Sequence, residues 1–220
     1  MHLPDALSVA PVIAIVRLPS AGGVARTLRA VVDGGVPAAE VTLTTPGALD
    51  ALAGARRELG DAACLGAGSV RTAADAVRAV DAGAAFLVTP TVAPAVLDAV
   101  SGTGIPVICG GLTPTELAAA QDAGAYAVKL FPARLFGPAY LRDVLAPMPD
   151  LRLVPTGGVG LADVAGYARA GAVAVAAGSA LVDPRLVAAG DWAALAERAA
   201  AFAAAWPAGD PALRGPAAPP

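Results

Sequence analysis

The chain contains a single lysine, Lys129, and this lysine lies within an apolar run, residues 126–131. An ammonium group in apolar surroundings either costs several kcal/mol or loses its proton. A lysine that is kept dry has a lowered pKa and can act near pH 7 as a neutral amine nucleophile, the kind of group that forms Schiff bases with ketones. Lys129 is therefore the first candidate catalytic residue.

A carboxylate occurs in a second apolar run, residues 40–44, where polar and apolar residues alternate. Glu40, Thr42 and Thr44 share one face of the expected strand, and in a barrel this polar face points inward while the apolar face packs against helices. The same alternation sends Lys129 inward. The structural interpretation of such a pair is a buried ion pair; the functional interpretation is a carboxylate that moves protons beside the amine.

Other catalytic chemistries lack the residues they need. The only histidine is His2, at a start that we expect to be mobile, so Ser-His-Asp, Cys-His and His-ligated metal chemistry are excluded. The two cysteines, Cys64 and Cys109, lie in separate apolar runs without ligands at metal-binding spacing. We expect them to be reduced core residues, and we expect no metal site.

Two late glycine-containing segments are suited to bind phosphate. Thr156 ends one apolar run and is followed by Gly157 and Gly158, and Gly178 and Ser179 follow the next run. Backbone N–H groups of such loops hold phosphate in many strand–helix barrels.

An arginine directly follows the first apolar run. Arg17 therefore lies at the end of an expected strand, at the end of the barrel where active sites are found. There its planar guanidinium can pair with a substrate carboxylate or phosphate. The alternative is a solvated surface arginine.

The elements that position these residues repeat along the chain. Apolar runs of four to seven residues alternate with Ala-rich, helix-favouring stretches. Glycine follows the end of many of these stretches, where it suits the last turn of a helix. The runs are Val12–Val16, Ala38–Leu43, Cys64–Gly68, Phe86–Thr89, Ile105–Cys109, Tyr126–Phe131, Leu153–Thr156 and Val173–Ala177. Eight strand–helix units predict a single-domain α/β fold, a (βα)₈ TIM barrel over residues 1–206.

The alternative fold is an open doubly wound sheet, which the absence of a Gly-x-Gly-x-x-Gly after the first run disfavours. Residues 207–220, rich in proline, are expected to form a disordered tail without an assigned function.

Composition limits the classes of partner. Of 220 residues, 56% are hydrophobic and 15% charged, with a net charge of −3, so the chain is expected to fold and not to bind nucleic acid. No run of 18 residues lacks Gly, Pro, Thr or a charge, which argues against a membrane span. No secretory leader is visible, so the expected location is the cytoplasm.

Taken in order, the motifs resemble the family of 2-dehydro-3-deoxy-phosphogluconate and 4-hydroxy-2-oxoglutarate aldolases, over roughly residues 10–206. The matching pieces are PVIAIVR at 11–17, EVTL at 40–43, GAGSV at 66–70, TP at 89–90, TPTEL at 113–117, VKLFP at 128–132, PTGGV at 155–159 and GSAL at 178–181. Singly several are loose, but in this order they are highly specific.

The resemblance implies a class I aldolase, a carbon–carbon lyase without metal or other cofactor. It would cleave a phosphorylated keto-deoxy sugar acid into pyruvate and glyceraldehyde 3-phosphate, and it typically assembles as a homotrimer. Carried over by position, Lys129 forms the Schiff base and Glu40 shuttles protons. The implied substrate-binding residues are Arg17, Thr44, Ser69, Pro90, Phe131, Thr156, Gly157, Gly158, Gly178 and Ser179.

Departures from the family pattern concern substrate choice. Some members carry Arg at the position of Thr44, so we expect carboxylate recognition to rest more on Arg17 here, and Ser69 stands where Thr is usual, keeping the hydroxyl. Cys109 stands before Gly110 where Pro is often found. Alternative substrates are the galactonate epimer and 4-hydroxy-2-oxoglutarate. Rival functions are a phosphate-binding barrel isomerase or synthase that does not use Lys129, and a non-catalytic sugar-phosphate binding protein.

Overall fold

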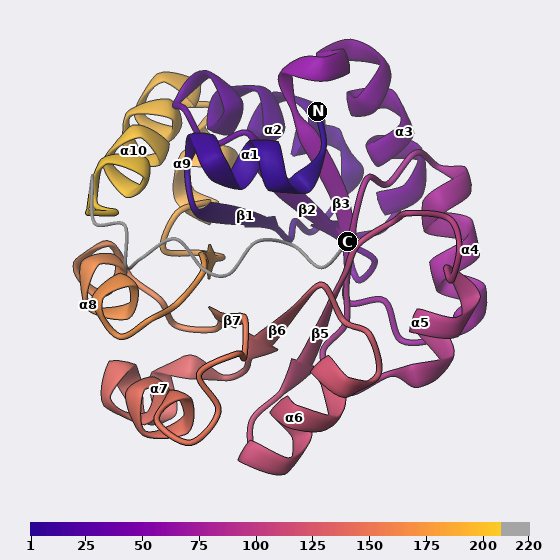
Figure 1. Ribbon diagram of the computed structural model, residues 1–220. Helices are drawn as coiled ribbons and strands as arrows, with labels where there is room; N and C mark the ends of the chain where they lie inside the picture. Colours follow the sequence, from indigo (N-terminus) through magenta and orange to yellow (C-terminus); the bar gives the residue numbers. More distant parts are fainter. Residues whose placement is uncertain (208–220) are drawn as a thin grey trace.

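In the computed structural model, which describes residues 1–207, eight parallel strands form one sheet that curls into a barrel (Figure 1). The order β7-β6-β5-β4-β3-β2-β1-β8 follows the chain except that β8 returns beside β1. A parallel bridge from Thr156 to Ala176 joins the two ends of the sheet. The predicted TIM barrel is confirmed, and the open sheet is wrong.

The elements alternate from strand to helix. The strands are β1 (Val12–Val16), β2 (Ala38–Thr42), β3 (Cys64–Gly68), β4 (Leu87–Val88), β5 (Val107–Gly111), β6 (Ala127–Leu130), β7 (Leu153–Pro155) and β8 (Val175–Ala177). The α-helices are α1 (Leu3–Val9), α2 (Val24–Asp33), α3 (Ala48–Leu59), α4 (Ala73–Asp81), α5 (Pro94–Ala99), α6 (Pro114–Asp122), α7 (Gly137–Leu145), α8 (Val164–Arg169), α9 (Pro184–Ala189) and α10 (Trp192–Ala204).

Several strands of the structure are shorter than the apolar runs from which they were predicted. Phe86 precedes β4 and yet is fully buried, because its ring lies where a side chain on Gly66 would otherwise project. Apolar residues just outside a strand can also pack inside the barrel, so the hydrophobic pattern continues past the end of the strand. Hydrophobicity alone therefore predicts strands that are too long.

Successive side chains of each strand point alternately outward and inward, and they form two separate hydrophobic cores. Outward residues such as Val41 and Val128 pack under the helices, whereas inward residues such as Ile13, Phe86 and Ile108 fill the barrel. Side chains of a strand point alternately to its two faces, and the sheet has closed on one of them. Glu40 and Lys129 therefore lie inside the barrel at strand positions flanked by outward-facing apolar residues.

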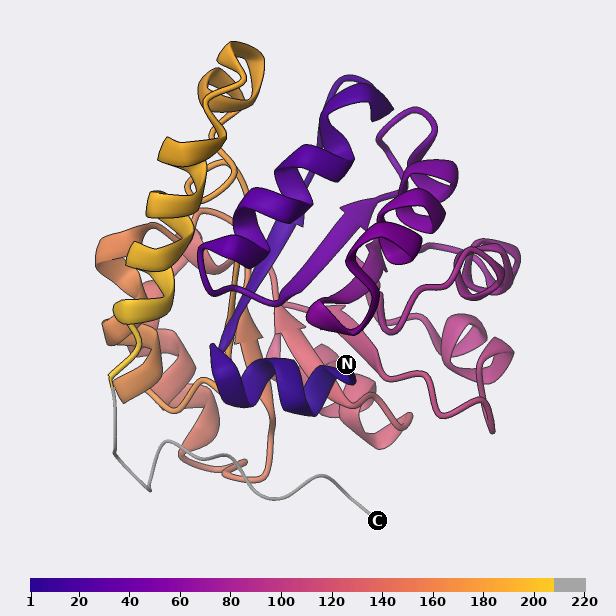
Figure 2. The same cartoon turned by 90° about the horizontal axis from the view of Figure 1, so that it is seen from above.

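The first residues of the chain, which were expected to be mobile, form a helix. Residues 3–9 form α1, which lies across the N-terminal ends of the strands (Figure 2). Leu3 and Ala6 are fully buried in the core that fills the barrel. The predicted mobile start is wrong because this short helix supplies apolar side chains that close the barrel's N-terminal end, a contact that only the tertiary structure creates.

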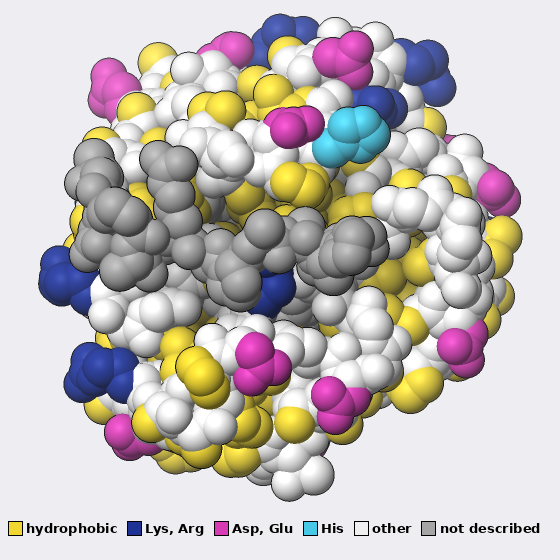
Figure 3. All heavy atoms as spheres, in the orientation of Figure 1, with side chains coloured by type: hydrophobic (Ala, Val, Ile, Leu, Met, Phe, Trp, Pro, Cys, Tyr) yellow, Lys and Arg dark blue, Asp and Glu magenta, His cyan; other side chains and the backbone are white. Residues whose placement is uncertain are grey.

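On the face that carries α1, acidic and basic side chains are dispersed around the edge and do not form a patch of one sign (Figure 3). Within residues 1–207, no helix is both long and apolar enough to cross a membrane. Apart from Pro207, the tail predicted to be disordered lies outside the described residues.

Candidate active site

A cavity of about 410 Å³ opens at the C-terminal ends of the strands. Parallel barrels carry their active sites at this end, because the loops that follow the strands converge there. The cavity is lined by Ile15, Arg17, Glu40, Ser69, Pro90, Lys129, Phe131, Thr156, Gly157, Gly158, Val159, Gly178, Ser179, Ala180, Val182 and Pro184. It thus gathers residues from seven of the eight strands or the loops that follow them.

Lys129 is almost enclosed, with 7% of the residue exposed. Its Nζ lies 5.0 Å from the centre of the Phe131 ring, and apolar side chains including Ile108 and Val154 lie beneath it. Burial lowers the pKa of Lys129, Glu40 opposes that shift and Arg17 adds to it. The amine therefore loses its proton at a lower pH than an exposed lysine does.

Glu40 is the partner carboxylate, 2% exposed. Burial raises its pKa, and the nearby Lys129 and Arg17 cations oppose the rise. Among the described residues, its Oε2 atom has no hydrogen-bond partner, and no nitrogen of Lys129 lies within 4.0 Å of its oxygens. The two groups affect each other through the cavity without forming a direct ion pair, a separation that suits proton transfer through a bound water or substrate hydroxyl.

A glycine in the neighbouring strand makes room for the carboxylate. Glu40 pairs in register with Gly66, and a methyl group on Gly68 would lie 2.5 Å from the Glu40 Cδ atom. The spacing of Gly66 and Gly68 places both on the inner face of β3. The absence of side chains there is what allows Glu40 to extend into the barrel.

The two glycine segments form another part of the cavity wall. The Gly157 and Gly158 backbones have φ angles of 88° and 80°, which favour glycine. In the described chain, no hydrogen-bond acceptor is paired with the N–H groups of these two residues, or with those of Ser179 and Ala180. Four backbone donors at the edge of one cavity are suited to an anion.

The remaining predicted residues line the cavity with one exception. Arg17 is exposed at its rim, and Ser69 has a φ of 59°, a conformation that is rare for a residue with a side chain. Strained backbone of this kind is often found at functional sites. Thr156 is buried and its hydroxyl donates to the Val154 carbonyl at 3.0 Å.

Thr44 does not line the cavity. Strand β2 ends at Thr42, the alternation stops there, and Thr44 is exposed with its hydroxyl sharing a hydrogen bond of 3.1 Å with Thr42. The predicted strand alternation does not extend to Thr44, because the chain turns toward α3 before that residue.

Sequence reasoning missed some of the apolar lining residues and the role of Gly68. Ile15, Val159, Val182 and Pro184 line the cavity, but nothing distinguishes them in the sequence from other core residues. Gly68 was detectable, because two glycines two residues apart on an inward face indicate that a neighbouring side chain needs space.

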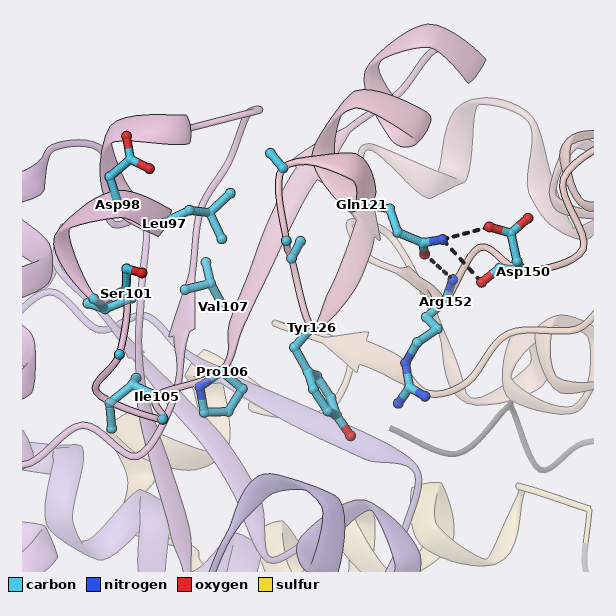
Figure 4. Close-up of a pocket in the computed structure, with 16 residues that line it drawn as sticks. Leu97, Asp98, Ser101, Ile105, Pro106, Val107, Gln121, Tyr126, Asp150 and Arg152 are labelled. Atoms are coloured by element: carbon cyan, nitrogen blue, oxygen red, sulfur yellow. Dashed lines mark hydrogen bonds between the residues drawn. The ribbon is translucent and has the colours of Figure 1, made fainter. Parts of the chain in front are cut away.

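A larger cavity of about 720 Å³ lies at the other end of the barrel, among the segments that precede β5, β6 and β7 (Figure 4). There Gln121 donates to the Asp150 carboxylate at 3.0 Å, and the Arg152 guanidinium stacks over the Tyr126 ring at 4.7 Å. It contains neither Lys129 nor Glu40. No cluster of three or more potential metal ligands (His, Cys, Asp or Glu) occurs within residues 1–207.

Comparison with known proteins agrees with this geometry. The model of the "KDPG and KHG aldolase" family matches residues 3–198. The chain belongs to this aldolase family. The aldolase is therefore a lyase that acts on carbon–carbon bonds, as the resemblance implied.

Relatives of the aldolase span most of its length. A 2-dehydro-3-deoxy-phosphogluconate aldolase of Treponema pallidum is 38% identical, over 86% of this chain and 88% of the relative. A probable 2-dehydro-3-deoxy-6-phosphogalactonate aldolase of Rhizobium meliloti is 36% identical, over 89% and 91%. The crystal structure of a KDPG aldolase from Legionella pneumophila, with pyruvate captured as a covalent carbinolamine intermediate, superposes with a TM-score of 0.83 at 26% identity, over 92% and 98%.

Substitution of Gly68 tests how Glu40 is accommodated. We expect Gly68→Ala to displace the Glu40 carboxylate and to lower the kcat of aldol cleavage by at least about tenfold, a loss of roughly 1.4 kcal/mol of transition-state stabilisation. Steady-state kinetics and thermal unfolding measure the effect. The matched control is Gly54→Ala in α3, where the nearest atom to an added methyl is Arg57 Nη2 at 3.9 Å. Equal kinetics of the two variants would contradict the assignment.

Proposed function

We propose that the chain cleaves 2-dehydro-3-deoxy-6-phosphogluconate to pyruvate and glyceraldehyde 3-phosphate through a Schiff base on Lys129. One observation carries the proposal: a buried lysine and a buried carboxylate share a cavity with four backbone N–H groups that have no acceptor within residues 1–207. The lysine supplies a nucleophile, the carboxylate a proton carrier and the N–H groups a phosphate site. Family membership supports the same reaction.

The first half of the reaction requires a neutral amine. Lys129 Nζ attacks the C2 carbonyl carbon to give a carbinolamine, which loses water to form a protonated imine. The lowered pKa of Lys129 increases the fraction of lysine able to attack near neutral pH. Because the imine itself withdraws electrons, the proposal involves no metal or organic cofactor.

The second half requires one group that first accepts and then donates a proton. Glu40 removes the proton of the C4 hydroxyl, directly or through water, while the C3–C4 bond breaks and its electrons enter an enamine. Glyceraldehyde 3-phosphate leaves, and the protonated Glu40 returns a proton to C3. Water then hydrolyses the imine and releases pyruvate. The raised pKa of Glu40 suits both roles, because its protonated form is accessible closer to neutral pH.

Substrate recognition uses the rest of the lining. Arg17 at the rim is our candidate for the substrate carboxylate, with Ser69 and Thr156 hydroxyls nearby in the same cavity. Phe131 and Pro90 form apolar wall beside the pyruvyl carbons. The N–H groups of Gly157, Gly158, Ser179 and Ala180, together with the hydroxyl of Ser179, hold the distal phosphate, and Gly178 allows the chain to approach it.

The test incubates the purified chain with the gluconate substrate, its galactonate epimer and 4-hydroxy-2-oxoglutarate, and measures pyruvate release. In parallel, borohydride is added with pyruvate, and peptide mass spectrometry locates the reduced adduct. We expect fastest release from the gluconate substrate and an adduct on Lys129. Pyruvate release without any adduct would overturn the Schiff-base route. Ligand binding with neither adduct nor product would favour a sugar-phosphate binding protein, and isomerised product would favour the barrel isomerase.

We also propose that the chain functions as a homotrimer in the cytoplasm. Large apolar side chains are exposed on two neighbouring segments, Leu135 and Phe136 after β6 and Leu161 after β7. The segments are joined by the hydrogen bond from Arg134 N to Gly157 O at 3.0 Å. Burial of such a patch favours association. Light scattering should give three times the chain mass of 21.3 kDa; a monomer would contradict the proposal.

A further inference from the structure

We propose that Arg198, in α10, is a positioning residue that holds residues 178–181 in the shape required to bind the substrate phosphate. This inference rests on the proposed function, because it assigns a support to the phosphate site described above. Arg198 does not line the cavity and is far from β8 in sequence. Its effect on the reaction therefore acts through the backbone that it contacts.

The contact is made to the main chain of the segment. Arg198 Nε donates a hydrogen bond to the Ala180 carbonyl, across 18 residues of sequence. The N–H of the same peptide group, that of Leu181, donates to the Gly178 carbonyl at 2.9 Å. The peptide between Ala180 and Leu181 is thus held at both ends, on one side by α10 and on the other by the segment's own turn.

Holding this peptide determines which groups remain available to a ligand. The N–H groups of Leu181 and Val182 are both occupied by the Gly178 carbonyl, at 2.9 and 2.8 Å. Those of Ser179 and Ala180 stay unpaired in the described chain and belong to residues that line the cavity. Without Arg198, the Ala180–Leu181 peptide would be held only by the bond from the Leu181 N–H to Gly178, and its carbonyl would lack a partner. A carbonyl oxygen that turned toward the cavity would repel phosphate.

Charge provides a second reason for an arginine at this position. Asp183, three residues beyond Ala180, is a carboxylate whose pKa is lowered to about 2, chiefly by hydrogen bonds from Arg185, with Arg198 contributing. A carboxylate close to a phosphate site opposes anion binding. Arg185 forms the ion pair with this carboxylate at 2.9 Å, and the Arg198 cation adds a smaller favourable charge while it also anchors the backbone, two effects that a neutral donor would not combine.

The helix that carries Arg198 is a firm support. Leu195, Ala199 and Phe202 of α10 are fully buried, and the helix packs against α2. Arg198 lies between two of these buried positions and is itself half-buried. Its guanidinium is therefore held by a rigid element, as a residue that shapes a binding segment must be.

The experiment compares phosphate-dependent and phosphate-free steps in Arg198→Met. We expect the KM for the phosphorylated substrate to rise about tenfold, because the phosphate-binding segment would no longer be held in its binding shape, with kcat within about twofold of wild type. The pyruvate concentration that gives half-maximal borohydride trapping on Lys129 should stay within about twofold, because pyruvate has no phosphate. Inhibition by inorganic phosphate should weaken in parallel with the KM.

Two further variants complete the test. Arg198→Lys keeps the charge and one donor, so it should recover part of the phosphate affinity; it also serves in place of the Met variant if that protein does not fold. Arg57→Met, an exposed arginine of α3 with no hydrogen bond among the described residues, is the control. Equal losses in the phosphorylated and pyruvate assays, or no loss in either, would overturn the inference. Failure of the proposed function is distinct, because wild type would then give no Lys129 adduct.

Discussion

Replacing Lys129 with methionine should remove the borohydride-trapped pyruvate adduct and lower turnover by roughly 10⁴-fold or more, because the covalent route is lost entirely. Methionine matches much of the volume of the lysine stem and has no amine, so the barrel should still fold. A buried ammonium makes little favourable contribution to stability in apolar surroundings such as Ile108 and Val154. Mass spectrometry, a pyruvate-release assay and thermal unfolding measure the three consequences.

Lys129→Arg is the matched control for charge. An arginine keeps the cation near Glu40, but its pKa is too high for it to become a neutral nucleophile. If Lys129 acted only by its charge, the arginine variant would retain activity; we expect it to be as inactive as the methionine variant. An adduct that persists on another residue in either variant would show that Lys129 is not the nucleophile.

Replacing Glu40 with glutamine should separate the two halves of the reaction. The amide can neither accept the C4 hydroxyl proton nor return one to C3, so we expect cleavage to slow by about 10²–10⁴-fold. Pyruvate should still form an adduct with Lys129, because that step depends chiefly on the amine. Single-turnover cleavage and borohydride trapping on the same preparation distinguish the steps. Equal slowing of both would place Glu40 in imine formation instead.

The same variant has a defined pH dependence. Glu40 raises the pKa of Lys129 against the larger lowering by burial. Removing the carboxylate's negative charge removes the raising contribution, so the folded-state pKa of Lys129 falls further. The pH at which adduct formation reaches half its maximum should therefore move to lower pH in Glu40→Gln than in wild type. A shift to higher pH would mean that Glu40 does not interact with the amine.

Local patterns in the sequence predicted much of this protein. Alternation around Glu40 and Lys129 indicated which side of each strand they face, because the two faces of a strand are a property of the backbone itself. Glycine at helix exits such as Gly124 and Gly171 indicated where strands begin, and both have positive φ angles. These inferences needed no knowledge of distant contacts, and the barrel agrees with them.

Contacts between distant segments decided the rest. The exit of Thr44 from the inner face depends on where β2 ends, and the folding of α1 over the strands depends on a core that exists only when the barrel is closed. Space for Glu40 comes from Gly68 of another strand, and support for Ala180 comes from Arg198 of the last helix. The sequence by itself determined residue types and faces; closure of the barrel determined which of them share a cavity, because packing joins groups that no local periodicity relates.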